Sequence, residues 1–418
     1  MDRRRFLKSL TFLTAASSVP AFVVRSLQAS AGTGGRQLAG QDRILVVIEL
    51  NGGVDGLSAV VPYSNDFYHQ ARPLLALPTD RVLKVNDDFA FHPGMAGFKE
   101  LFDRGEVSVI HGVGYPNPTR SHFLALDIWH TARPEAKTTE GWLAQYVDAL
   151  PNPEALAAVN VGGNPPLAMI SSEGTKPAIR SIESFKLDIL AGAEDVDATP
   201  RNLAFEQLQS LPQESSLLDF TARTALEATF TSDELLDGVQ NYSSGIDYPD
   251  TTFAERLQTV AKLISADLGV RVFYVTLHGF DTHANQVIAS DNLVGVHPRL
   301  LSTFSDGVKA FQDDLRQLGV SDRVLTMTVS EFGRRLAEND SFGTDHGTAN
   351  PLFLIGEGVE PGFFGEHPSL APDDLDDVGD MQFNIDFRRA YATALDTWLG
   401  GSSSQILGEF LPLDVLRV

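Results

Sequence analysis

The sequence predicts an α/β protein built on a doubly wound, mostly parallel sheet with helices on both faces. Short apolar runs typical of buried strands occur at residues 44–50, 107–110, 270–277 and 324–329. Apolar residues at helical spacing directly precede the third and fourth runs. This alternation favours parallel strands whose connecting helices cover the sheet. A polar cluster also follows each run at once, as expected where loops leave the carboxyl ends of strands.

The first 31 residues have the features of an export signal. A twin arginine opens the segment Arg3-Arg4-Arg5-Phe6-Leu7-Lys8, an apolar stretch follows at residues 10–24, and Ala29-Ser30-Ala31 offers a cleavage site. The apolar stretch is shorter than the ~20 residues of a membrane-spanning helix. We therefore expect residues 1–31 to be a cleaved twin-arginine signal peptide, with an uncleaved N-terminal anchor as the alternative. Cleavage predicts a periplasmic or secreted protein without a transmembrane span.

Composition excludes several classes of function. The chain has no cysteine, which excludes disulfides, thiolate metal sites and a cysteine nucleophile. Its formal charge is −23, and removing the signal, with five basic residues and one acid, makes it more negative. Such a charge disfavours nucleic acid and anionic membranes as partners. An anionic substrate would need local cations, supplied by a metal or by arginine. The sequence does not indicate a protein partner.

The rest of the chain is expected to form one large domain. Residues 32–41 are a Gly-rich linker, and residues 42–418 show no obvious break. Residues 150–250 are irregular in composition, and we interpret them as a cap or insertion over the sheet. A last amphipathic helix is predicted at residues 390–399, closed by Gly400-Gly401. An apolar fraction of 43% suffices for a buried core.

Two pairs of residues are candidate ligands for a divalent metal. Asp281 and His283 follow the third strand, and Asp345 and His346 lie between glycines just before an apolar run at residues 352–355. Carboxylate and imidazole are the common ligands of sites without thiolates. The alternatives are a surface loop for the first pair and a turn stabilised by Asp345 for the second.

Two further acids are candidate ligands. Glu331 ends the fourth strand, where an unpaired buried charge would be costly, so it either binds the metal or forms an ion pair with a following arginine. Asp55 follows the first strand in a Gly-rich loop and is either a ligand or part of a turn. The predicted ligand set is therefore Asp55, Asp281, His283, Glu331, Asp345 and His346, for Zn, Mn, Ca or Mg.

Catalytic groups are predicted beside these ligands. Ser121 could be a nucleophile activated by the metal, and Arg120 or Arg334 could face an anionic oxyester. The alternative for Ser121 is a helix N-cap, because residues 123–129 have a fair helical start. The two roles are compatible, since a helix N-terminus also favours an anion.

The chain resembles the DUF1501 family of exported bacterial proteins over essentially the whole of residues 42–418. The segments that carry the resemblance are Leu50-Asn51-Gly52-Gly53-Val54-Asp55-Gly56-Leu57, Arg120-Ser121-His122-Phe123, Gly279-Phe280-Asp281-Thr282-His283, Ser330-Glu331-Phe332-Gly333-Arg334 and Gly343-Thr344-Asp345-His346-Gly347. This family is similar in turn to the alkaline phosphatase and sulfatase superfamily. That likeness implies an alkaline phosphatase-like fold and one or two metals.

The same likeness implies an arrangement of the site. Asp281, His283 and His346 would form one metal site, and Asp55, Ser121 and Glu331 the second site and nucleophile. The chain departs from the sulfatases at residues 116–120, where proline occupies the position converted to formylglycine, so that chemistry is not expected there. It also has Ser330-Glu331 where the superfamily has an Asp-His pair, which leaves the number of metals open.

These observations predict an exported, metal-dependent hydrolase of phosphate or sulfate esters. Its substrate would be a small-molecule or polysaccharide ester. The alternative is a non-catalytic exported protein on the same fold, with a structural metal or an empty site. A structural metal should raise the melting temperature strongly, whereas a catalytic one need not.

Overall fold

A computed structural model describes residues 42–151, 156–179, 239 and 241–417. The predicted signal peptide and linker, residues 1–41, lie outside the described residues. Within these described residues the main sheet has nine strands. They are β1 (Ile44–Asn51), β5 (Val107–Gly114), β6 (Ala158–Val161), β9 (Ala178–Ile179), β10 (Val272–His278), β11 (Val324–Val329), β12 (Asn350–Ile355), β13 (Gly362–Phe364) and β14 (Ile385–Asp386).

The order and direction of the strands decide where the loops meet. The order is β13-β5-β12-β11-β1-β10-β6-β9, and β14 also pairs with β5. Strand β12 runs antiparallel to both of its neighbours, and the other pairings are parallel. The predicted mostly parallel sheet is confirmed. The carboxyl ends of β1, β5, β10 and β11 therefore share one edge, and the amino end of β12 lies at that edge too.

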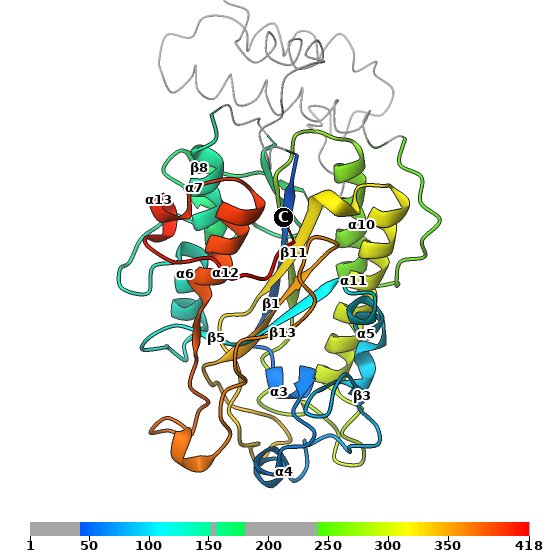
Figure 1. The fold of residues 1–418 in the computed structure, drawn as a ribbon, viewed down its shortest axis with the longest axis vertical. Helices are drawn as coiled ribbons and strands as arrows, with labels where there is room; N and C mark the ends of the chain where they lie inside the picture. Colours follow the sequence, from blue (N-terminus) through cyan, green and yellow to red (C-terminus); the bar gives the residue numbers. More distant parts are fainter. Residues whose placement is uncertain (1–41, 152–155, 180–238, 240, 418) are drawn as a thin grey trace, which may run out of the picture. The chain divides into compact units, whose positions relative to one another are not determined.

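Helices cover both faces of the sheet, as predicted (Figure 1). On one face Val46 and Ile48 of β1 pack in a core with α5 (Ala96–Asp103), α10 (Thr252–Ser265) and α11 (Val296–Gln317). On the other face Leu45 and Val47 share a core with α6, α7, α12, η5 and α13. Successive side chains of a strand point to opposite faces, so this one strand supports both cores. The second group comprises α6 (His122–Thr131), α7 (Trp142–Asp148), α12 (Phe387–Ala392), the π-helix η5 (Thr393–Trp398) and α13 (Ser403–Leu407).

Smaller elements complete the described fold. A three-stranded sheet follows the first loop, and a two-stranded sheet lies between β6 and β9 in sequence. These elements are α3 (Gly56–Ala59), β2 (Val60–Val61), α4 (Asp66–Ala71), β3 (Leu83–Lys84), β4 (Ala90–Phe91), η1 (Pro93–Met95), η2 (Leu167–Met169), β7 (Ile170–Ser171), β8 (Gly174–Thr175), η3 (Ser321–Arg323) and η4 (Pro372–Asp374). Among the described residues, every helix is too short or too polar to span a bilayer.

The irregular middle segment contributes to the sheet as well. Within residues 150–250, strand β6 pairs with β10 and strand β9 pairs with β6, so both belong to the main sheet. Residues 180–238, where most of the predicted cap falls, lie outside the described residues.

Candidate metal centre

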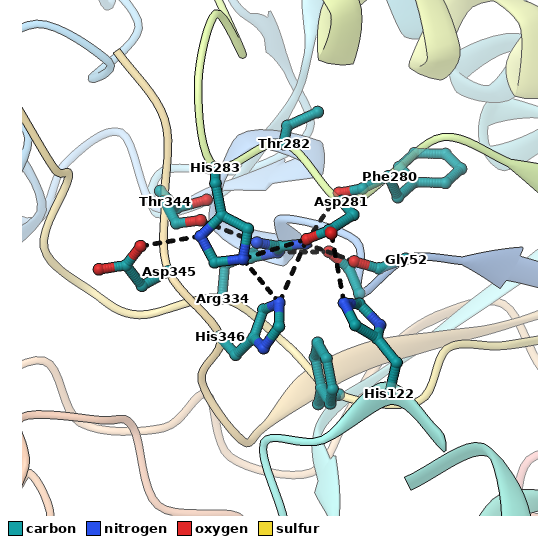
Figure 2. A network of polar contacts seen from close by, with 12 residues as sticks. Gly52, His122, Phe280, Asp281, Thr282, His283, Arg334, Thr344, Asp345 and His346 are labelled. Atoms are coloured by element: carbon teal, nitrogen blue, oxygen red, sulfur yellow. Dashed lines mark hydrogen bonds and ion pairs between the residues drawn. The ribbon is translucent and has the colours of Figure 1, made fainter. Parts of the chain in front are cut away.

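Side chains from three separate loops meet at the carboxyl edge of the sheet. His122, Asp281 and His346 each offer a ligand atom within 4.8 Å of the others. The Nε2 of His283 lies 2.8 Å from the Nε2 of His346 and 3.2 Å from the Oδ1 of Asp281. Figure 2 shows the three imidazoles arranged around the Asp281 carboxylate. Asp281 is 48% exposed and His283 43%, so a substrate in solution can reach the cluster.

Strand direction explains why these residues meet. His122 opens α6 after β5, and Asp281 and His283 follow β10, so all three leave carboxyl ends of parallel strands. His346 precedes β12 in sequence. Because β12 is antiparallel, its amino end lies at the same edge and brings His346 to the other ligands.

Each of the three imidazoles is oriented through its Nδ1 atom. His122 Nδ1 lies 2.8 Å from Glu331 Oε1, and His283 Nδ1 lies 2.9 Å from Asp345 Oδ1. His346 Nδ1 lies 2.8 Å from the carbonyl oxygen of Arg120. A carbonyl or carboxylate oxygen can only accept, so each Nδ1 carries the hydrogen and donates it. In the neutral rings every Nε2 is then left with a lone pair directed at the cluster.

These lone pairs favour a cation, either a proton on a ring nitrogen or a metal ion. His283 Nε2 and His346 Nε2 face each other at 2.8 Å, which repels unless a positive charge lies between or beside them. His122 Nε2 is buried without a hydrogen-bond partner among the described residues, 3.4 Å from Asp281 Oδ2. Atoms that bind one ion at about 2.0–2.2 Å are themselves close together. A hydrogen-bonded outer partner on each histidine is also typical of metal sites. The residues therefore fit a divalent metal.

Arg334 supports Asp281 from beneath the cluster. Its side chain is fully buried and donates to Asp281 Oδ1 at 2.9 Å and to the carbonyl oxygens of Gly53, Thr344, Gly52 and Phe280. Burial raises the pKa of Asp281, but the hydrogen bond and the positive charge of Arg334 hold it at about 2. Asp281 is thus an anion near neutral pH. The sequence suggested that the Arg334 guanidinium could face an anionic substrate. In the structure it instead joins three loops of the protein.

Arg120 is also engaged by protein acids. Its guanidinium donates to Asp380 and, at 3.0 Å, to Asp376. Its contribution to the cluster is the carbonyl oxygen that orients His346. The structure therefore does not place either predicted arginine head group free beside the metal ligands.

Two predicted acidic ligands, Glu331 and Asp345, are hydrogen-bonded to histidines of the cluster and are not part of it. Glu331 Oε1 accepts from His122 and from the backbone N–H of Gly52, while its other oxygen is buried without a partner among the described residues. Asp345 Oδ1 accepts from His283, and this hydrogen bond lowers the pKa of Asp345. Both carboxylates orient histidines.

Asp55, the remaining predicted ligand, lies apart from the cluster. It is fully buried and forms a two-pronged ion pair with Arg72, at 2.7 and 2.9 Å. It also accepts from Ser58 and Gln286. Among the described residues the second metal site suggested by the resemblance is not assembled, because both oxygens of Asp55 and Oε1 of Glu331 accept from protein donors.

Ser121 takes the predicted N-cap position of α6, next to the ligand His122. Its side chain makes no capping hydrogen bond, and within the described ranges its hydroxyl has no hydrogen-bond partner. It is partly exposed. Within the described residues the hydroxyl therefore has no hydrogen-bonding role, and it lies at the positive end of a helix that begins with a candidate metal ligand.

His122 is a candidate metal ligand that the sequence did not indicate. In the sequence it appears only within the segment Arg120-Ser121-His122-Phe123. The signal available was its position after a strand-like run, which it shares with Asp281 and His283. What the sequence could not show was that Glu331, distant in sequence, would fix its Nδ1 and leave Nε2 directed at the cluster.

Gly52 allows the first loop to pass directly against the cluster. Its φ is +120°, and an added Cβ would lie 2.3 Å from the backbone nitrogen of Asp281. We expect Gly52→Ala to displace Asp281 and to weaken metal binding, since both the clash and the backbone conformation oppose it. Titration of the apo protein with Zn²⁺ checks this. Gly163→Ala is the control, because a Cβ there meets nothing within 4 Å. Equal affinities in both variants would contradict the prediction.

The chain belongs to the DUF1501 family. The family model, described as a protein of unknown function (DUF1501), matches residues 42–409. No curated protein matches the chain in sequence.

Solved structures with a similar fold come from the alkaline phosphatase superfamily and from sulfatases. A protein in the alkaline phosphatase superfamily from Vibrio parahaemolyticus is 10% identical, with 88% of this chain and 71% of that chain covered, at a TM-score of 0.34. The PsFucS1 sulfatase from Pseudoalteromonas sp. is 11% identical, with 93% and 72% covered, at a TM-score of 0.40. The C-terminal periplasmic domain of EcEptC from Escherichia coli, in complex with Zn, is 10% identical, with 75% and 73% covered, at a TM-score of 0.33.

Proposed function

We propose that this member of the DUF1501 family is an exported, metal-dependent hydrolase of phosphate or sulfate esters. The observation that carries the proposal is the convergence of three imidazole Nε2 atoms on the Asp281 carboxylate, with each Nδ1 held by an acceptor. The site opens to solvent, and a free hydroxyl adjoins it at Ser121. Export is proposed from the twin-arginine pattern of residues 1–31.

The donor set favours one transition metal. His122, His283 and His346 would supply nitrogen and Asp281 oxygen, a set that suits Zn or a similar first-row metal. Ca and Mg prefer oxygen ligands, so these two members of the predicted range fit less well. Among the described residues, His122, Asp281 and His346 form the one group of three potential ligands within 4.8 Å of one another, which supports a single metal.

A divalent metal bound there would polarise an ester oxygen and lower the pKa of a nearby hydroxyl group. The protein residues do the positioning. Glu331, Asp345 and the Arg120 carbonyl hold the three imidazoles in their orientations, and Arg334 holds the Asp281 carboxylate in place.

The N-terminus of α6 would receive the anionic group of the ester. The helix has ten residues and begins at His122, so its positive end lies at the cluster. In the reaction, the oxygen of Ser121 or of a water molecule attacks phosphorus or sulfur. The ester bond breaks, and the departing alcohol takes up the proton lost by the attacking group. If Ser121 attacks, the phosphoryl or sulfuryl group is transferred to its oxygen. A water molecule then attacks phosphorus or sulfur, the bond to Ser121 Oγ breaks and Oγ takes up the proton that the water loses, and phosphate or sulfate leaves.

Replacing Ser121 tests which oxygen attacks. We expect Ser121→Ala to lower kcat on an aryl phosphate or sulfate by at least about 100-fold, without loss of the metal. Ser64→Ala, at an exposed position away from the cluster, is the control and should leave kcat unchanged. A loss below tenfold would show that water attacks directly. If the metal-loaded wild type cleaves none of a broad set of phosphate and sulfate esters, the hydrolase proposal is wrong, and a binding or structural protein remains.

A further inference from the structure

We propose that Gln286 is a positioning residue that clamps together, from their buried side, the two loops carrying Asp281, His283 and His346. In this role it sets how tightly the site binds metal. The inference rests on the metal centre proposed above, but the clamp itself can be measured without metal.

Gln286 contacts both loops through one atom. Its side-chain Oε1 accepts from the hydroxyl of Thr282 at 3.1 Å and from the hydroxyl of Thr344 at 2.8 Å. All three residues are buried, with Gln286 1% exposed. A second link runs directly between the loops, because the backbone N–H of Thr344 donates to the carbonyl oxygen of Thr282 at 3.3 Å.

The two threonines lie within two residues of the candidate ligands. Thr282 lies between Asp281 and His283, and Figure 2 shows its side chain directed away from the cluster. Thr344 lies two residues before His346. The hydrogen bonds from both threonines to Gln286 therefore fix the backbone from which the ligand side chains project. The loops are also joined by Arg334, by backbone hydrogen bonds and by the Asn339 side chain, but Gln286 is the side chain that bonds both threonines next to the ligands.

Asp55 fixes the orientation of the clamp. The Gln286 Nε2 donates to Asp55 Oδ2 at 2.6 Å, and Arg72 holds the same carboxylate from the other side. Burial raises the pKa of Asp55, but Arg72 depresses it far below the ordinary value, so Asp55 is an anion that only accepts. The amide must therefore present its oxygen to both threonines. This explains a buried acid in the first loop that binds no metal.

The test compares two buried glutamines. Gln286→Met keeps the side-chain length but removes all three hydrogen bonds. Gln312→Met is the matched control, because Gln312 is 2% exposed and bonds Thr326 Oγ1, at 3.2 Å, away from the ligand loops. We expect Gln286→Met to weaken Zn²⁺ or Co²⁺ binding by about 10–100-fold, as loss of outer partners does elsewhere. Gln312→Met should leave affinity unchanged, although both variants lower the melting temperature.

Amide hydrogen exchange on the metal-free proteins gives the independent result. Exchange at residues 281–286 and 343–347 should accelerate in Gln286→Met and not in Gln312→Met. Unchanged exchange in Gln286→Met would overturn the clamp. A metal affinity of Gln286→Met as high as that of Gln312→Met would also overturn it. If the wild type binds no metal but exchange accelerates as expected, the clamp stands and the proposed metal centre falls.

Discussion

A variant with Asp281 and His346 both replaced by alanine is expected to retain no divalent metal, whereas the wild type retains one ion per chain. The double change removes the central carboxylate and one of the three imidazoles around it. Removing a ligand should lower the metal affinity by more than the ~100-fold upper limit found when only a residue hydrogen-bonded to a ligand is removed. Turnover of any ester substrate should disappear together with the metal. Elemental analysis of dialysed protein measures the retained ion.

The matched control changes the same residue types nearby. His278 is exposed at the end of β10 and bonds Asn51, and Asp340 is exposed in the loop that leads to Asp345. The variant His278→Ala with Asp340→Ala should retain its metal. If both double variants retain an ion equally, the metal lies elsewhere and the proposed ligands are wrong.

Arg72→Met is expected to destabilise the fold by about 3–5 kcal/mol. The change leaves the Asp55 carboxylate fully buried without its two-pronged partner. Unfolding in urea measures the loss. The double variant Arg72→Met with Asp55→Asn should recover part of it, because no unpaired charge remains buried. A double variant less stable than Arg72→Met would contradict this explanation.

The same pair has a definite pH signature. The folded pKa of Asp55 is depressed, so its contribution to stability is complete above the unfolded pKa of about 4 and is lost as pH falls below it. In Arg72→Met the pKa of folded Asp55 is no longer depressed, because the neighbouring positive charge is gone. Asp55 can then take up a proton as the pH falls. The difference in unfolding free energy between wild type and Arg72→Met should therefore shrink on acidification from pH 7 to pH 3. A difference that grows would show that the charge of Asp55 is not the cause.

Much of the fold was predictable because buried strands leave a direct pattern in the sequence. The four apolar runs became β1, β5, β10 and β11, which are parallel and end at one edge. That regularity also brought Asp281 and His283 to the correct edge. The direction of β12 was not predictable, because an apolar run is the same in either orientation. Yet this direction is what places His346 beside His283.

The roles of individual polar residues were harder to predict than their location. Asp55, Glu331 and Arg334 all lie near the expected edge, but their partners are distant in sequence or come from the backbone. Asp55 pairs with Arg72, and Arg334 donates to carbonyl oxygens of three loops as well as to Asp281. A sequence gives the charge of a buried side chain but not the groups that satisfy it. Those groups decide whether the side chain binds a ligand or supports one.

The most direct test of the metal centre is an anomalous difference map from crystals of the metal-loaded protein. We expect one peak at the carboxyl edge of the sheet, about 2.0–2.2 Å from the Nε2 atoms of His122 and His346 and from a carboxylate oxygen of Asp281. The Nε2 of His283 completes the expected ligand set. A map without a peak there, or with the metal bound only elsewhere, would contradict the central claim.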